Sequence, residues 1–210
     1  CGIQMNTEVN ALKKVTSDIQ RPITCIIGGS KISTKTNVIK NLIPKFENII
    51  VVGGMANNIL SFKGYNIGNS INENNCSKTI QEIFSLAKKN NCNLVFPLDV
   101  AVGKKLNDKA EIKNLTDIKN DEMILDIGPK TISAVELLLD KSKTVLWNGP
   151  AGYFENPDFA VGSKKIVKKI VDLKKNIYSV AGGGDTIALL NNENALEKLD
   201  FVSTAGGAFL

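Results

Sequence analysis

The sequence predicts an α/β fold, in which a doubly wound parallel sheet carries helices on both faces in three α/β/α layers. Two observations lead to this prediction. Short β-branched or apolar runs alternate along the chain with longer stretches of helical period, an order typical of doubly wound sheets. The runs are also apolar at successive positions, as expected for parallel strands that are buried on both faces.

The elements follow one another in a Rossmann-like order. An opening helix is expected at residues 6–19, and Arg21-Pro22 ends it. A less regular stretch at 99–121, rich in Lys, Asp and Asn, is interpreted as a hairpin or short excursion within the domain. We assign residues 1–20 to a leading helix and 21–210 to one α/β domain. Strands are expected at 23–27, 48–52, 93–96, 123–126, 144–147, 177–181 and 201–203, and amphipathic helices between them at 38–42, 80–89, 132–139 and 161–173.

Composition excludes several classes of protein. The 210 residues are 43% hydrophobic and 22% charged, an ordinary globular balance, and the net charge of +5 comes without a long run of like charges. Four Cys and no His leave no zinc pattern, and no stretch approaches the ~20 apolar residues that span a bilayer. We expect a cytoplasmic protein, a monomer, with no nucleic-acid and no membrane partner. Both ends look cut, because the chain starts with Cys1 and stops just after a glycine turn.

Glycine recurs where the apolar runs end. The carboxyl ends of parallel strands share one edge of a sheet, so five such turns are expected to line one binding crevice. Glycine lets the backbone approach a ligand closely, and the free N–H groups of a following helix attract an anion. The pattern therefore indicates a phosphate-binding edge. The turns are Gly28-Gly29, Gly53-Gly54, Gly149 with Gly152, Gly182-Gly183-Gly184 and Gly206-Gly207.

The turn at Gly182-Gly183-Gly184 leads into a predicted helix that starts with Asp185-Thr186. Asp185 can bind a cation or simply cap the helix, and the residues alone leave these two interpretations about equal. The chain has no Walker motif, no dinucleotide-binding G-x-G-x-x-G after a strand, and no protein-kinase signature. Residue chemistry therefore indicates a phosphate-binding α/β domain without defining its activity.

Five motifs in order resemble the carboxyl-terminal, nucleotide-binding domain of the phosphoglycerate kinase family over nearly the whole chain. They read IIGGSKISTK, VGGMA, WNGPAGYFE, GGGDT and STAGGA. The resemblance implies reversible phosphoryl transfer between 1,3-bisphosphoglycerate and ADP, giving 3-phosphoglycerate and ATP, with Mg²⁺ as cofactor of the nucleotide. It also implies an amino-terminal domain, absent here, that holds the phosphoglycerate. This chain would then be the half that binds MgADP or MgATP and be inactive alone.

The resemblance gives roles to two lysines. Lys31 is similar to the lysine that follows the transferring phosphoryl group, and Lys35 to one that reaches the phosphates as the domains close. An ammonium is a compact mobile charge that suits the spread charge of phosphoryl transfer. The alternative is a solvated pair in the first turn of a helix, although a helix N-terminus disfavours cations.

Further roles are implied by the same motifs. Glu155 resembles the acceptor of the ribose hydroxyls, Asn148 a donor to the phosphates, and Asp185 the magnesium ligand. Asn148 with its following residues could instead be an ordinary turn. The base slot would be lined by Ile124, Leu125 and Pro150. The catalytic set is Lys31, Lys35, Gly183 and Gly206, and the nucleotide contacts add Gly28, Gly29, Gly53, Gly54, Gly182, Gly184 and Thr186.

The sequence departs from the family pattern at two positions of the site. Ile124 stands where a small glycine often lines the base slot, and Ala205 replaces the first glycine of the last turn. Besides a half-enzyme, we considered a module that binds nucleotide without catalysis and a structural or dehydrogenase-like α/β domain. The missing G-x-G-x-x-G and the retained Lys31, Lys35 and Asp185 count against the last of these.

Overall fold

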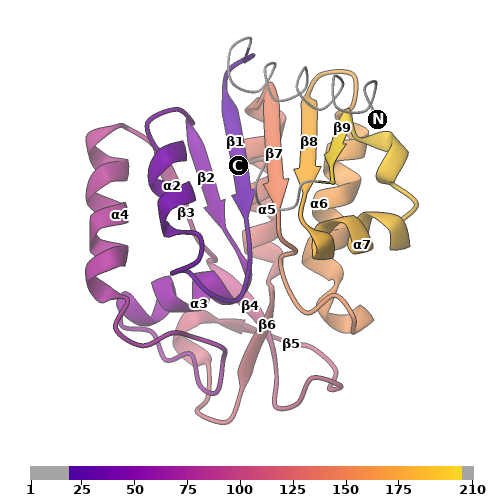
Figure 1. The fold of residues 1–210 in the computed structure, drawn as a ribbon. Coiled ribbons are helices and arrows are strands. Elements are labelled where there is room, and N and C mark those ends of the chain that lie inside the picture. The colour runs from indigo at the N-terminus through magenta and orange to yellow at the C-terminus, as the bar shows by residue number, and fades with distance from the viewer. Residues whose placement is uncertain (1–18, 205–210) are drawn as a thin grey trace.

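A computed structural model describes residues 19–204 of the protein (Figure 1). The helix expected at 6–19, apart from its last residue, and the predicted turn at Gly206-Gly207 with Ala205 lie outside the described residues. Within the described part, the α/β fold is confirmed, with helices on both faces of a parallel sheet.

The main sheet has six strands in the order β3-β2-β1-β7-β8-β9, and every neighbouring pair is parallel. The chain builds outward from β1 to one edge, then returns to β7 on the other side of β1 and builds to the opposite edge. The order therefore reverses between β1 and β7, where doubly wound folds bind their ligands. The strands are β1 (Ile23–Ile27), β2 (Asn48–Val51), β3 (Asn93–Val95), β7 (Thr144–Asn148), β8 (Tyr178–Gly182) and β9 (Phe201–Ser203).

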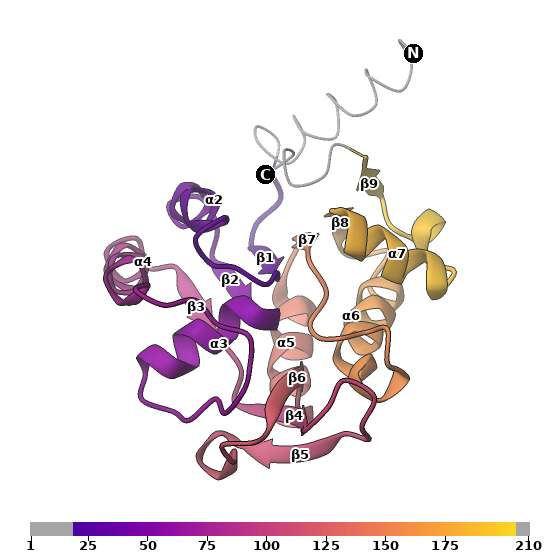
Figure 2. The ribbon, with the colours of Figure 1, turned by 60° about the horizontal axis from the view of Figure 1, so that its bottom comes forward.

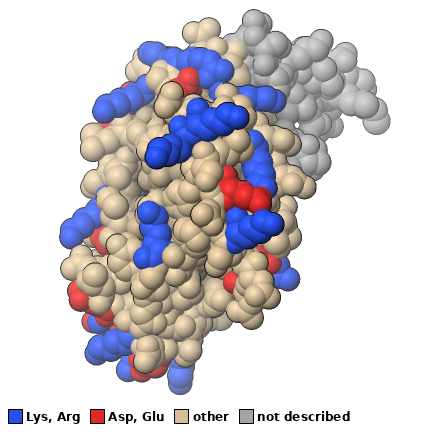
Figure 3. Space-filling model, turned by 90° about the vertical axis from the view of Figure 1, so that its left-hand side faces the viewer, with Lys and Arg blue, Asp and Glu red and all other residues tan. Residues whose placement is uncertain are grey.

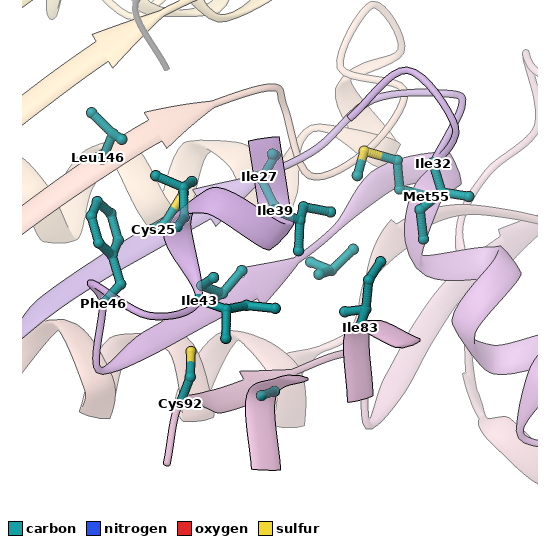
Figure 4. Packing of buried hydrophobic residues seen from close by; sticks show 14 of the residues in the cluster. Cys25, Ile27, Ile32, Ile39, Ile43, Phe46, Met55, Ile83, Cys92 and Leu146 are labelled. Carbon is teal, nitrogen blue, oxygen red and sulfur yellow. The ribbon is translucent and has the colours of Figure 1, made fainter. Parts of the chain in front are cut away.

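Two apolar cores sandwich this sheet, since successive residues of a strand face opposite sides. On β1, Cys25 and Ile27 pack into the core beneath α2, α3 and α4, while Ile26 joins the core beneath α5, α6 and α7. Figure 4 shows the first core, with Phe46 and Ile43 beside Cys25. The helices are α2 (Thr36–Leu42), α3 (Gly53–Phe62), α4 (Ser77–Lys89), α5 (Pro129–Lys141), α6 (Val161–Asp172) and α7 (Gly184–Asn192), with short 3-10 turns η1 (Leu115–Asp117), η2 (Pro157–Phe159) and η3 (Leu196–Lys198).

One predicted strand lies elsewhere. The strand expected at 123–126 is not part of the parallel sheet: β6 (Met123–Ile127) pairs antiparallel with β4 (Asp99–Gly103). β4 also pairs antiparallel with β5 (Glu111–Asn114), which confirms the hairpin expected within 99–121. The three strands form a sheet in the order β5-β4-β6, which stands beyond the carboxyl edge of the main sheet, next to α3 and α5 (Figures 1 and 2).

The surface over α4 is mixed in charge. Figure 3 shows Lys and Arg side chains scattered among acidic and uncharged ones on this face rather than joined in one basic patch. Lys40 of α2 and Glu82 of α4 form an ion pair there, with 2.7 Å between Nζ and Oε2. Among the described residues, no helix has the length and apolar character needed to cross a membrane.

Candidate functional site

A cleft of about 320 Å³ opens at the carboxyl edge of the main sheet, at the switch point between β1 and β7. The turn after β1 contributes Gly29, and the turn after β2 contributes Gly53 and Gly54. The loop after β7 forms another wall from Pro150 onward, and the small sheet closes the cleft opposite these turns. Glycines from the turns after β1, β2 and β7 therefore line one cavity, whereas none of Gly182, Gly183 and Gly184 does, and the fifth predicted turn lies outside the described residues.

Two of these turns touch each other. A Cβ added to Gly28 would lie 2.6 Å from the backbone oxygen of Pro150. Gly149 has φ of +103°, and a Cβ there would lie 2.5 Å from the oxygen of Gly28. A real side chain cannot come so close to backbone atoms, so glycine is required at both positions for the loops after β1 and β7 to pack side by side.

One half of the cleft is apolar. Ile124 and Leu125 of β6 lie opposite Pro150, so the three residues expected to line a base slot do line one cavity. Two further apolar side chains, Ile71 and Leu106, join them from the α3–α4 and β4–β5 connections, and both are largely exposed. A flat apolar ring would lose little hydration and gain much contact in such a slot.

A buried carboxyl lies beside this apolar half. Asp126 is only 2% exposed, and its oxygens accept hydrogen bonds from the N–H groups of Gly162 (2.9 Å) and Ile127 (2.8 Å). Burial raises the pKa of Asp126 to about 7, although the two N–H groups act in the opposite direction. The cleft therefore has a titratable group beside it that changes charge near neutral pH.

A polar group adjoins the cleft around Asn148, the last residue of β7. Lys35 Nζ donates to Asn148 Oδ1 over 3.0 Å, which fixes the orientation of the amide. The Nδ2 group of Asn148 is buried and has no hydrogen-bond partner among residues 19–204, and a Cβ on Gly183 would lie 3.2 Å from it. A buried donor without an acceptor is costly, so an incoming anion would find an unused hydrogen-bond donor here.

Helix α7 begins at the same place. Its N-cap, Gly183, has φ of +95° and no side chain, so the first turn has no side-chain cap. A Cβ on Gly184 would meet no atom of the described residues within 4 Å. Asp185 is exposed and lines the cleft, whereas Thr186 is fully buried and its hydroxyl accepts from the N–H of Gly149 over 2.7 Å.

The structure brings most of the predicted site together. Eight of those residues line the cleft, while Lys35, Asn148 and Gly183 form the adjoining polar group. Lys31 is exposed and lies outside the cleft wall, and Lys35 is the N-cap of α2, so both lysines precede the helix rather than occupy its first turn. Gly182 is a buried strand residue. The cleft residues are Gly29, Gly53, Gly54, Ile124, Leu125, Pro150, Glu155 and Asp185.

Sequence reasoning missed several residues of the cleft. Tyr153 lies within the WNGPAGYFE motif and Asp126 directly follows Leu125, a predicted base-slot residue, so their positions in the sequence could have indicated them. Ile71 and Leu106 carry no signal, because single apolar residues in polar loops resemble ordinary surface residues.

A parallel sheet whose strand order reverses beside a glycine-lined cleft defines a class: doubly wound α/β domains that bind ligands at the carboxyl edge. The family model described as phosphoglycerate kinase matches residues 1–210. The chain therefore belongs to the phosphoglycerate kinase family.

Individual relatives agree with this assignment. The phosphoglycerate kinase of Francisella philomiragia subsp. philomiragia is 43% identical over 211 residues, and that of Xanthobacter flavus is 40% identical over 213 residues. Both alignments cover 100% of this chain but only 53% and 54% of the relatives. The chain thus spans about half the length of the curated relatives it matches.

Solved structures show the same relation. The phosphoglycerate kinase of Coxiella burnetii superposes with a TM-score of 0.93 at 38% identity, covering 98% of this chain and 53% of that one. The enzyme of Pyrococcus horikoshii gives a TM-score of 0.78 at 25% identity, with coverage of 98% and 52%. The backbone arrangement is therefore shared with the corresponding half of these enzymes.

Proposed function

We propose that this chain binds MgADP or MgATP as the nucleotide-holding half of a phosphoglycerate kinase. One observation carries the proposal: an apolar slot at the switch point of the sheet adjoins Asn148 Nδ2 and the start of α7, which among the described residues have no hydrogen-bond acceptor and no side-chain cap, respectively. A nucleotide has the same two halves, an apolar base and an anionic phosphate chain. Membership of the family gives the proposal its second support.

The two halves of the site give the nucleotide a direction. The base would enter between Ile124 and Pro150, and the exposed carboxylate of Glu155 would accept hydrogen bonds from the ribose hydroxyls. The phosphates would then lie toward Asn148 Nδ2 and the uncapped start of α7 at Gly183. Ile124 lines the slot from the side of the small sheet.

The residues at α7 also fit a magnesium ion bound with the phosphates. Asp185 is exposed in the first turn, lines the cleft, and takes part in no ion pair among the described residues. Mg²⁺ is commonly held by one or two carboxylates together with phosphate oxygens and water. The ion would neutralise charge on the phosphates. Thr186 supports the site from below by holding the N–H of Gly149.

The reaction of the whole enzyme is also a proposal, supported by the same site and by membership of the family. Lys31 and Lys35 would supply mobile positive charge to the transferring phosphoryl group between ADP and 1,3-bisphosphoglycerate. The acceptor, 3-phosphoglycerate, would be held by the portion of the relatives that this chain does not match. We therefore expect negligible turnover by this chain alone. The predicted monomeric state, the cytoplasmic location and the role of Gly206 stay predictions.

Calorimetry tests the binding. Titration of the chain with MgADP is expected to release heat with one-site saturation, whereas no heat and no competition with MgATP would contradict nucleotide binding. A coupled assay with 3-phosphoglycerate and MgATP is expected to give no turnover. Turnover near that of a two-domain relative would refute the idea that the acceptor site lies outside this chain.

Asp185→Ala tests the magnesium ligand. The variant is expected to bind ADP equally well with and without Mg²⁺, because the carboxylate that links the ion to the protein is gone. Asp172→Ala is the matched control: Asp172 is an exposed aspartate on α6 that pairs with Lys168, away from the cleft. If Asp185→Ala keeps the magnesium dependence of the control, Asp185 is not a ligand.

A further inference from the structure

Glu73 holds the loop that carries the two lysines. This lysine loop, residues 30–35, runs from the end of the β1 turn to the cap of α2. Glu73 Oε2 accepts from the N–H of Ser33 over 2.9 Å, and Oε1 accepts from the Ser33 hydroxyl over 2.6 Å. The two hydrogen bonds to one carboxylate fix both the position and the orientation of Ser33.

The lysine loop has a second support from below. Ile32 is fully buried in the core beneath α2, so the loop is anchored at adjacent residues by apolar packing and by the Glu73 carboxylate. Lys31 precedes this anchored pair and Lys35 follows it after one further residue. The burial of Ile32 fixes the position of the lysine loop, and the hydrogen bonds of Ser33 to Glu73 restrict rotation of the loop about Ile32. The direction of the lysine side chains depends on both.

Glu73 belongs to a segment that also shapes the apolar half of the cleft. In this connecting segment, residues 67–73, the hydroxyl of Ser70 accepts from the N–H of Ile124 over 2.7 Å. The oxygen of Ile71 accepts from Asn57 Nδ2 over 2.9 Å, and the side chain of Ile71 lines the cleft. Ser70, three residues before Glu73, thus bonds the connecting segment to β6, the strand that carries Ile124.

The segment is held firmly on α3 as well. The N–H of Glu73 donates to Asn58 Oδ1 over 2.8 Å, and Asn58 is only 4% exposed. The backbone of Glu73 is therefore fixed to a buried side chain while its carboxylate reaches the lysine loop. The connecting segment therefore joins β6, through Ser70, to the lysine loop, through Glu73.

We propose that Glu73 is a positioning residue, which holds the lysine loop so that Lys31 and Lys35 face the phosphates of a bound nucleotide. The inference rests on the proposed nucleotide binding. Glu73 itself would touch no ligand atom, since it lies outside the residues that line the cleft. Its effect would therefore fall on the phosphate part of the binding free energy and leave the base part unchanged.

The test compares ligands with and without phosphates. Affinities of MgATP and of adenosine are measured by calorimetry for the unaltered chain, Glu73→Gln and Ser33→Ala. A glutamine keeps one acceptor oxygen for the N–H of Ser33 but removes the charge, and its NH2 group only donates, so the Ser33 hydroxyl would have to accept where it now donates. We expect MgATP affinity to fall roughly two- to fivefold in each variant, with adenosine affinity unchanged. The loss of affinity in the double variant should be smaller than the sum of the two single losses, because both changes weaken the same contact between Glu73 and Ser33.

Glu82→Gln is the matched control. It removes the same charge from an exposed glutamate whose partner, Lys40, lies on α2 beyond the lysine loop. Its MgATP affinity is expected to stay at the unaltered value. Equal losses for MgATP and adenosine in Glu73→Gln would overturn the positioning role, and so would no loss at all.

Amide hydrogen exchange without ligand separates this inference from the proposed function. Glu73→Gln is expected to speed exchange at residues 31–35, and the control is not. If the unaltered chain binds no nucleotide while exchange still quickens, the proposed function fails but Glu73 remains the residue that holds the loop. Unchanged exchange at residues 31–35 in Glu73→Gln would show that Glu73 does not hold the lysine loop.

Discussion

The buried carboxyl of Asp126 predicts that the protein loses stability as pH rises toward neutrality. The unfolded chain releases this proton near the ordinary pKa of 3.8, whereas the folded state keeps it up to a pKa of about 7. Between these values unfolding releases a proton, so the contribution is fully present below 3.8 and is lost as pH rises through about 7. Each pH unit inside the window changes the free energy of unfolding by about 1.4 kcal/mol.

Urea unfolding of the unaltered chain and of Asp126→Asn, followed by circular dichroism, measures this effect. Between about pH 5 and about pH 7.5 the unaltered chain should lose about 2 kcal/mol relative to the variant, because the amide does not titrate. Asp126→Asn should be less stable at the lower pH, since its single oxygen cannot accept from both Gly162 and Ile127. Glu47 and Glu82 have lowered pKa values and affect stability only below about 4.5, outside this range. A difference between the two proteins that does not change with pH would refute the reasoning.

Two further changes test the packing of the turns. Gly28→Ala should destabilise the chain by about 1–3 kcal/mol in urea unfolding, because the new methyl group would press on the backbone oxygen of Pro150. Gly184→Ala is the control, because a Cβ there meets no described atom within 4 Å, and it should change the stability little. Equal losses of stability in the two variants would contradict the steric argument. Thr186→Val should lower the free energy of unfolding by about 1–3 kcal/mol, because it leaves the buried N–H of Gly149 without an acceptor. Thr186→Ser keeps the hydroxyl and should be about as stable as the unaltered chain. If Thr186→Ser is as unstable as Thr186→Val, the hydroxyl is not the cause.

Much of the fold could be predicted because parallel strands and their helices have strong local patterns. The strands at Ile23–Ile27 and Phe201–Ser203 have the predicted bounds, and the others differ by one or two residues. The strand at Met123–Ile127 was wrongly placed, since an apolar run does not reveal its partner. Its pairing is set by the nearby hairpin, a tertiary effect that no window of sequence contains.

The site was predictable where backbone geometry demands a residue type, and not where side chains meet by folding. Gly28 and Gly183 could be found because only glycine suits their contacts or conformation. The bond between Lys35 and Asn148 joins residues 113 positions apart, and nothing local indicates it. Glu73 looked like any surface glutamate, since its role depends on Ser33, 40 positions earlier in the chain.

The cleft at the switch point has a consequence for how the chain would respond to heat. Its walls come from residues between 29 and 185, in the connections after β1, β2, β3, β4 and β7, in α3 and α7, and in β6, so the cavity exists only while these elements are packed together. A ligand that occupies it at a hundred times its dissociation constant adds about 2.7 kcal/mol to the stability of the folded chain. That gain extends to the edge strands β3 and β9, which contribute no residue to the cavity. The melting temperature of the domain is therefore a gauge of how much of the cleft is filled.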